Sequence, residues 1–171
     1  MCKIIVLGHG DHGKDVFAEM LAKKLNLTFK SSSIFACERI VYPVLKDKYN
    51  YQSVLECYND RRNHREEWKV LIKEYNKEDL SRLAKELFKE FDIYVGLRDK
   101  EEFEAIKRDI RLDDVIWVDA SLRKPLESKK SFNIEKDASM SIINNNLDLK
   151  NLEAEVNTYS AFLVKFLKGD K

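Results

Sequence analysis

The chain begins with an apolar run that leads directly into a glycine-rich loop. Residues 3–7 read Lys-Ile-Ile-Val-Leu, which is typical of a strand buried on both faces of a parallel sheet. Gly8 and Gly13 follow with four residues between them, and Lys14 comes next. This is the spacing of a phosphate-binding loop (P-loop), in which backbone N–H groups surround a phosphate and the lysine reaches its oxygens.

The residues after the loop predict the helix that such a loop needs. Apolar side chains recur at helical spacing from a start near Gly13, at Phe17, Met20, Leu21 and Leu25. Because the motif is short, the alternative is a glycine-rich turn that binds nothing. The strand before it and the helix after it favour nucleotide binding. The predicted nucleotide-binding residues of the loop are Gly8, Gly10, Asp11, His12, Gly13, Lys14 and Asp15.

One loop position departs from the usual motif. Asp15 stands where a Ser or Thr normally follows the lysine and binds Mg²⁺. A carboxylate is a hard oxygen ligand for Mg²⁺, and it also opposes the positive end of the helix dipole. We therefore predict ATP and Mg²⁺ as cofactors, with Lys14 and Asp15 as catalytic residues. His12 either orients a phosphate or the acceptor, or is a solvated bystander.

Length and charge limit the other possibilities. We expect 171 residues to form a single domain, residues 1–171, with a real core. With 31 basic and 30 acidic side chains, affinity for a polyanion would need a local cluster. The three cysteines show no metal-ligand spacing, and no apolar stretch approaches the length of a membrane span. We expect a cytoplasmic enzyme without a signal peptide or a membrane partner, either monomeric or homodimeric.

Apolar periodicity predicts alternating strands and helices. After the first strand, strands are expected at 27–30, 92–96, 115–118 and 140–143, and helices at 31–48, 52–75, 80–90, 100–108 and 149–166. Strands separated by helices form a parallel sheet that is covered on both faces. Ligands bind such a sheet at the carboxyl ends of its strands, which here follow Leu7, Val95 and Val118.

Several segments together resemble a known family. The chain is similar to the nucleoside monophosphate kinase-like P-loop proteins, and to the phage deoxynucleoside monophosphate kinases in particular. The resemblance spans nearly the whole chain, but only its first segment is highly specific. That segment is GHGDHGKD at 8–15, and the others are DRRNHREEW at 60–68, DIYVGLR at 92–98, VIWVD at 115–119 and SIINNN at 141–146. The resemblance implies a three-layer α/β fold whose five parallel strands have the order 2-3-1-4-5.

The resemblance also implies where the acceptor and the metal bind. Arg98 follows a central strand and is expected to face the transferred phosphate as a catalytic and substrate-binding residue. In the family, an acidic residue at the end of that strand is the second Mg²⁺ ligand, but this chain has no acidic residue at that position. Asp119, at the end of the next strand, is the fallback metal ligand, or else it caps the following loop.

A cluster of arginines supplies the other candidates for the acceptor phosphate. Arg61, Arg62 and Arg65 lie close together in a predicted helix, with positions 61 and 65 on one face. Arginine forks bind phosphate through two hydrogen bonds, so Arg61 and Arg65, together with Arg39, are substrate candidates in an acceptor-binding helical segment of about 31–90. The alternative for the cluster is surface ion pairing with neighbouring acidic residues.

The polar stretch at 120–135 is predicted to be a lid. In the related kinases, a mobile segment after this strand closes basic groups over the phosphates, and Arg123 is the expected nucleotide-binding residue here. An ordinary polar loop is the alternative, although long loops without structure are uncommon unless they act as lids.

Three functions remain open at this stage. The first is phosphoryl transfer from ATP to a deoxynucleoside monophosphate, a small-molecule partner. The second is phosphorylation of 5-hydroxymethyl-pyrimidine bases in DNA, which phage relatives of this family carry out. The third is a nucleotide-binding module without turnover. A net charge of +1 favours a small substrate over duplex DNA. If the chain is phage-encoded, the expected location is the host cytoplasm.

Overall fold

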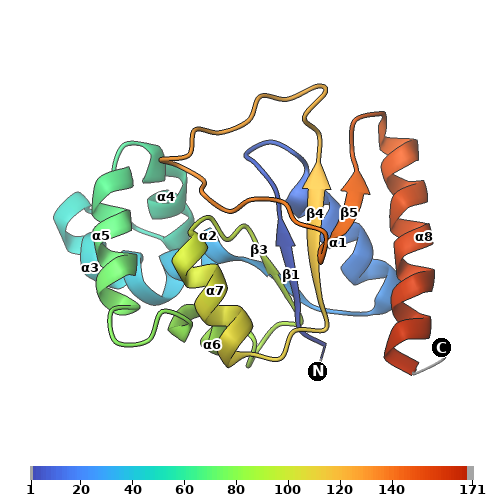
Figure 1. The fold of residues 1–171 in the computed structure, drawn as a ribbon. Coiled ribbons are helices and arrows are strands. Elements are labelled where there is room, and N and C mark those ends of the chain that lie inside the picture. The colour runs from blue at the N-terminus through green and yellow to red at the C-terminus, as the bar shows by residue number, and fades with distance from the viewer. Residues whose placement is uncertain (1, 169–171) are drawn as a thin grey trace.

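In the computed structural model, which describes residues 2–168, five parallel strands form one sheet in the order β2-β3-β1-β4-β5 (Figure 1). The strands are β1 (Ile4–Leu7), β2 (Phe29–Ser31), β3 (Ile93–Val95), β4 (Asp114–Asp119) and β5 (Ser141–Asn144). The predicted strand order and the three-layer α/β architecture are therefore confirmed. β1 lies at the centre of the sheet, between β3 and β4.

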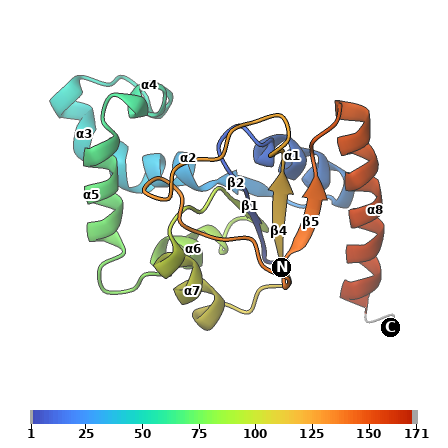
Figure 2. The same ribbon diagram turned by 45° about the horizontal axis from the view of Figure 1, so that its top comes forward.

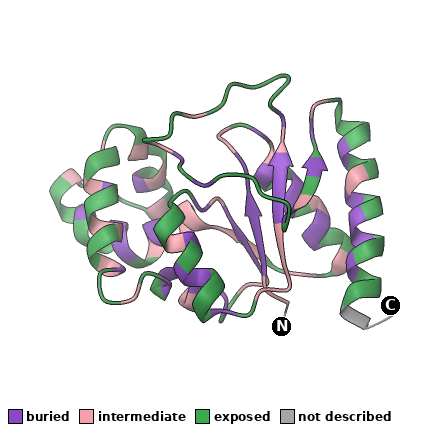
Figure 3. Ribbon diagram, viewed as in Figure 1, coloured by how far each residue is buried: buried purple, intermediate pink, exposed green. Residues whose placement is uncertain are grey.

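The alternation of side chains along β1 builds the two faces of the sheet. Ile4 and Val6 pack against α1 (Lys14–Leu25) and α8 (Leu149–Lys168), which cover one face. Ile5 and Leu7 point into a second cluster on the opposite face. All four side chains are fully buried, as the continuous apolar run predicts for a central parallel strand (Figure 3).

The second face is covered by the helices between β2 and β4. They are α2 (Ser32–Ala36), the π-helical turn η1 (Cys37–Val41), α3 (Tyr42–Tyr49), α4 (Val54–Asn59), the 3₁₀ turn η2 (Asp60–Arg62), α5 (Arg65–Tyr75), α6 (Arg82–Leu87) and α7 (Lys100–Asp109). Figure 2 shows α3, α4 and α5 extending beyond the β2 side of the sheet. Among residues 2–168, no helix is both long and apolar enough to cross a membrane.

One predicted helix is broken. The single helix expected over 52–75 is wrong, because α4 ends at Asn59 and α5 begins only at Arg65. Asp60 accounts for the break: its carbonyl accepts the Asn63 N–H and its carboxylate accepts the Asn63 side-chain amide. Such local bonds compete with the helical ladder. The predicted apolar face of α5 survives, and Trp68 on it is buried.

The helix predicted over 31–48 is confirmed over Ser32–Tyr49, with a π-helical turn in its middle. Within that turn, the Tyr42 N–H donates to the carbonyl of Cys37, five residues earlier. Pro43 follows directly and has no N–H to continue the regular pattern. The wider turn therefore accommodates the proline without ending the helix.

β4 and β5 are joined by a crossover segment, residues 120–140, that contains neither helix nor strand. It leaves the top of β4, runs toward α4 and returns to the start of β5 (Figure 1). Phe132, Ile134 and Met140 are buried on it and take the place of a crossover helix over the sheet. The ring of Phe132 packs edge-on against Trp117 of β4, with the ring centres 5.6 Å apart.

We predict that Gly8→Ala destabilises the fold by at least about 2 kcal/mol, because the loop backbone leaves no room for a side chain. Gly8 has a φ of 140°, and a Cβ there would lie 2.5 Å from the carbonyl oxygen of Val118. Gly10→Ala is the matched control, since its Cβ would meet only the flexible end of Glu127, at 3.2 Å. Urea unfolding measures both variants. Equal losses of stability would contradict this packing of the loop against β4.

Candidate functional site

The loop between β1 and α1 has the backbone shape of a P-loop. Gly8 and Gly13 adopt positive φ angles of 140° and 88°, and Asp11 adopts 60°. Asn145, in the connection after β5, holds the loop backbone in place, because its side-chain amide donates to the His12 carbonyl at 2.8 Å. The first N–H groups of α1, which follow the loop, have no partners within the helix.

Lys14 lies inside the loop. Its side chain is buried, and its ammonium donates to the carbonyl oxygen of His9 at 2.6 Å. Burial lowers the pKa of Lys14, and the nearby positive charge of Arg98 lowers it further. A buried ammonium with one carbonyl partner has donors left over, so the loop holds a positive charge that an anion would stabilise.

A carboxylate from the same chain lies against this loop. Glu127 accepts the Gly10 N–H through Oε2 at 2.6 Å, and its Oε1 pairs with the guanidinium of Arg98. Burial raises the pKa of Glu127, but the bonds from Arg98 and Gly10 outweigh it and hold the pKa below its ordinary value. Glu127 therefore presents charged oxygens to the donors that a phosphate would use.

Two loop histidines hold the crossover segment in this position. His9 Nδ1 accepts the backbone N–H of Glu127 at 3.1 Å. His12 Nδ1 accepts the backbone N–H of Ala120 at 3.1 Å, and its Nε2 lies 3.4 Å from the carbonyl of Pro125. The possibility that His12 is a solvated bystander is wrong, because its side chain is fully buried. Its contacts position the segment after β4.

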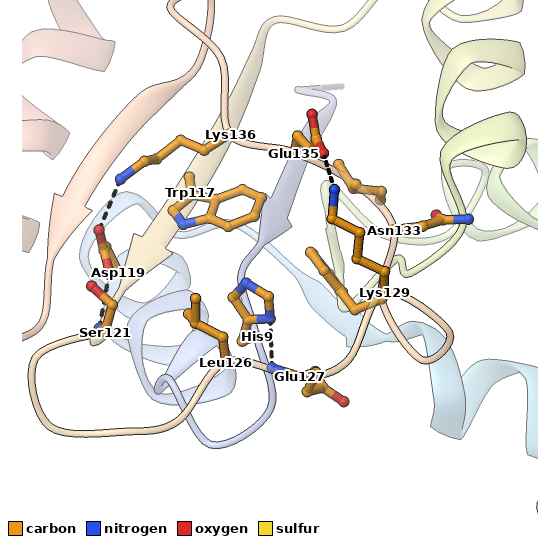
Figure 4. A pocket seen from close by; sticks show the side chains of 12 residues that line it. His9, Trp117, Asp119, Ser121, Leu126, Glu127, Lys129, Asn133, Glu135 and Lys136 are labelled. Carbon is orange, nitrogen blue, oxygen red and sulfur yellow. Dashed lines mark hydrogen bonds and ion pairs between the residues drawn. The ribbon is translucent and has the colours of Figure 1, made fainter.

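Figure 4 shows a cavity beneath the crossover segment in close-up. This cavity of about 340 Å³ lies between His9, Trp117 and Leu126, with Asp119 and Lys136 at one end. Burial lowers the pKa of His9, whose ring packs 4.6 Å from that of Phe132. The crossover segment therefore covers a cavity at the carboxyl end of β4.

The predicted metal ligands occupy different environments. Asp119 accepts Lys136 Nζ and the Ser121 N–H, each at 2.9 Å, through its two oxygens. Burial raises the pKa of Asp119, but Lys136 and Ser121 outweigh it and lower the pKa to about 2. Both oxygens thus orient the following loop. Asp15 is exposed in the first turn of α1, next to Lys14 in sequence.

These surroundings limit how Mg²⁺ would be held. Across residues 2–168, no three or more His, Cys, Asp or Glu side chains cluster closely enough to form a metal site. Mg²⁺ usually binds one or two carboxylates together with water and substrate phosphates. The exposed carboxylate of Asp15 beside the phosphate-binding loop fits that arrangement.

A cavity of about 450 Å³ lies beside the end of β3. Its walls come from α2, α5 and α6, from β3 and the segment that follows it, and from the first turn of α7. Arg98 lines it and also pairs with Glu127, so one guanidinium connects the cavity with the P-loop. A volume of this size suits a small organic ligand.

The other predicted arginines lie elsewhere. Arg39 pairs with Glu90, and Arg61 donates to the Tyr58 carbonyl at 2.9 Å. Arg65 is exposed at the start of α5, and the break before it puts Arg61 on a separate turn, so the predicted shared face is wrong. None of these three lines the 450 Å³ cavity; Lys69 and Lys73, farther along α5, do so instead.

Arg123 lies at the same edge of the sheet as the loop. Its Nε donates to the Asn145 carbonyl at 2.5 Å, which places it over the connection between β5 and α8. Lys129, in contrast, pairs with Glu135 at 3.0 Å on the exposed part of the crossover segment. Arg123 is therefore held near the loop, because it contacts Asn145, which in turn donates to the His12 carbonyl.

Glu127 and Glu102 are candidate functional residues that the sequence analysis missed. Glu127 stands in a polar stretch whose basic residues suggest phosphate contacts, so its own charge gives no indication of its place. Glu102 lines the 450 Å³ cavity but occupies the acidic first turn of a helix, a common position for a carboxylate. Only their contacts in the folded structure distinguish Glu127 and Glu102 from ordinary surface carboxylates.

Comparison with known proteins shows the fold. No protein-family model and no curated protein sequence matches this chain. A gluconokinase from Sinorhizobium meliloti 1021 superposes over 99% of this chain and 97% of its own, with a TM-score of 0.53 and 13% sequence identity. A sugar kinase from Janibacter sp. HTCC2649 matches over 93% and 94%, with a TM-score of 0.46 and 11% identity. At this identity, the first likeness establishes a common P-loop α/β fold.

We predict that Glu127→Gln binds ATP about fivefold more tightly than the wild type. A neutral amide holds Gly10 and Arg98 less strongly than a carboxylate does, by about 1 kcal/mol, and so competes less with phosphate. Titration with a fluorescent ATP analogue measures the change. Glu135→Gln, on the exposed part of the same segment, is the control and should bind like the wild type. Unchanged or weaker binding by Glu127→Gln would show that its carboxylate does not occupy the phosphate position.

Proposed function

We propose that this protein is an ATP-dependent phosphotransferase acting on a small nucleotide, with a deoxynucleoside monophosphate as the favoured acceptor. The observation that carries the proposal is the position of the Glu127 carboxylate, which pairs with the Gly10 N–H and Arg98 beside the buried Lys14. This arrangement of donors is suited to an anionic phosphate chain. The cavity on the other side of Arg98 is the proposed acceptor site.

The residues divide the work of phosphoryl transfer between them. An acceptor oxygen attacks the γ-phosphorus, and the bond to the leaving oxygen of ADP breaks. Lys14 and the loop N–H groups stabilise charge on the phosphates, and Arg98 aligns the acceptor with the donor. Mg²⁺ bound at Asp15 would neutralise phosphate charge. The predicted lid, residues 120–135, excludes water once Glu127 has left the loop.

The likeness to a gluconokinase makes a sugar acid the second candidate acceptor. The fold alone does not choose between a hydroxyl and a phosphate acceptor. The cavity favours the nucleotide, because Ile72, Leu80 and Leu83 give it apolar walls that suit the faces of a base. Two alternative functions stay open: phosphorylation of 5-hydroxymethyl-pyrimidine bases in DNA, and nucleotide binding without turnover.

The test of the function is ADP release in the presence of Mg²⁺ and ATP with a panel of acceptors. The panel contains the four deoxynucleoside monophosphates, gluconate and duplex DNA carrying 5-hydroxymethyluracil. Turnover that depends on a monophosphate supports the proposal. Turnover with gluconate or with modified DNA alone assigns the chain to one of the alternatives. If the protein binds ATP but no acceptor gives turnover, the function is that of a nucleotide-binding module without catalysis.

We predict that Lys14→Ala lowers the acceptor-dependent rate at least about 100-fold, because the phosphates lose their buried positive charge. Lys24→Ala is the matched control, since Lys24 is exposed in the last turn of the same helix. Its rate should equal that of the wild type. Thermal unfolding of both variants separates a loss of catalysis from a loss of folded protein, and an active Lys14→Ala would contradict the mechanism.

A further inference from the structure

The cavity beneath the crossover segment takes no part in the proposed transfer of phosphate. Its volume of about 340 Å³ lies within the range of small-molecule sites. Three aromatic rings form one of its walls: His9 from the P-loop, Trp117 from β4 and Phe132 from the crossover segment. Each ring packs against the other two, with ring centres between 4.6 and 5.7 Å apart. The wall is suited to pack against a flat ring.

Two ring N–H groups of this wall have no hydrogen-bond partner. His9 Nδ1 accepts the Glu127 N–H at 3.1 Å, so the proton of the His9 ring is on Nε2. Within residues 2–168, neither His9 Nε2 nor Trp117 Nε1 takes part in a hydrogen bond.

The Trp117 N–H opens into the cavity. No buried side-chain nitrogen in the described part of the chain lacks a partner, so the unpartnered indole nitrogen is reached by solvent. The Trp117 side chain is otherwise buried, and it lines the cavity (Figure 4). The cavity is therefore the space that reaches this donor, and a ligand there can accept from it.

The charged side chains around the cavity are already paired. Lys136 donates to Asp119 at 2.9 Å, and Lys129 pairs with Glu135 at 3.0 Å. Glu127 pairs with Arg98, which lies outside the lining. Because the lining contains three carboxylates and two lysines, it disfavours an anion such as a nucleotide phosphate. An uncharged ligand leaves all of these pairs intact.

We propose that this cavity binds an uncharged planar nitrogen heterocycle of the size of a nucleobase, and that the bound ring keeps Glu127 in the P-loop. The flat ring packs against the aromatic wall. Its ring nitrogen or carbonyl oxygen offers an acceptor to the N–H groups of His9 and Trp117. A hydrocarbon ring would leave these donors unpaired, which is the reason for a heterocycle.

A ligand in this cavity contacts the sheet and the crossover segment at once. Trp117 belongs to β4, whereas Leu126 and Phe132 belong to the crossover segment. The ligand therefore binds best when the segment has the observed position, in which Glu127 accepts the Gly10 N–H at 2.6 Å. A phosphate chain in the P-loop needs the same N–H group. The heterocycle and a phosphate chain thus oppose each other's binding.

The first test is calorimetric titration with adenine, which is planar and uncharged at neutral pH. The wild type should bind it. Trp117→Phe keeps an aromatic ring but has no N–H, so it should bind adenine about fivefold more weakly. Trp68→Phe is the matched control and should bind like the wild type, because Trp68 is buried on α5 and does not line the cavity. Thermal unfolding checks that both variants are folded.

A second measurement leaves the cavity unchanged. The chain has two tryptophans, so Trp117 is the only one left in Trp68→Phe. Its fluorescence should change as adenine binds, with the affinity that calorimetry gives, because the base packs beside the indole. Binding heat without a change in fluorescence would place the adenine elsewhere and overturn the inference.

Inorganic tripolyphosphate tests the link to Glu127, because it offers phosphates to the P-loop without carrying a base. Saturating adenine should weaken the binding of tripolyphosphate about fivefold, and tripolyphosphate should weaken the binding of adenine by the same factor. This antagonism rests on the proposed function, which places phosphate in the P-loop, whereas the adenine site itself does not.

Three results would overturn the inference. They are a wild type that does not bind adenine, a Trp117→Phe variant that binds it as tightly as the wild type, and adenine and tripolyphosphate that bind independently or strengthen each other. Phosphoryl transfer by a wild type that does not bind adenine would leave the proposed function standing. If tripolyphosphate does not bind at all, the proposed function and the antagonism both fail, and calorimetry and fluorescence alone decide the adenine site.

Discussion

The site depends on the contact between the Glu127 carboxylate and the P-loop. A loop of this shape brings backbone N–H groups and a buried lysine close together. An anion bound there satisfies these donors, and its absence would leave them unpaired, which destabilises the fold. Glu127 supplies that anion from the crossover segment, and His9 and His12 hold the backbone around it. The position of the crossover segment is thus set by the electrostatics of the loop as well as by its buried side chains.

Arg98 extends this pairing to the 450 Å³ cavity beside the end of β3. Its guanidinium holds Glu127 on one side and lines the proposed acceptor site on the other. A phosphate that replaces Glu127 would therefore change the partner of Arg98 and release part of the crossover segment in the same step. In the proposed function, the binding of the donor and the binding of the acceptor would thus be coupled through the Arg98 side chain.

The sequence predicts what local patterns encode. The apolar run at 3–7, the glycine spacing and the helical periodicity after it predict the first strand, the loop and the first helix, and the alternation of elements predicts a parallel sheet. The strand order, in contrast, followed only from the resemblance to a known family. Contacts between distant residues escape such patterns: Gly10 and Glu127 are 117 positions apart. The break between α4 and α5 was missed because the bonds from Asp60 to Asn63 compete locally with a strong helical pattern.

Lys14 and Glu102 show why a site can be harder to predict than the fold around it. Burial shifts the pKa of each toward the neutral form, downward for the lysine and upward for the carboxyl. Either group would be a poor choice for stability alone, so neither follows from the rules that build the core. Glu127 compensates the charge at the loop, whereas the described residues place no cation against Glu102. Lys14 is therefore complementary to an anion at the loop, whereas Glu102 faces the cavity that Arg98 also lines.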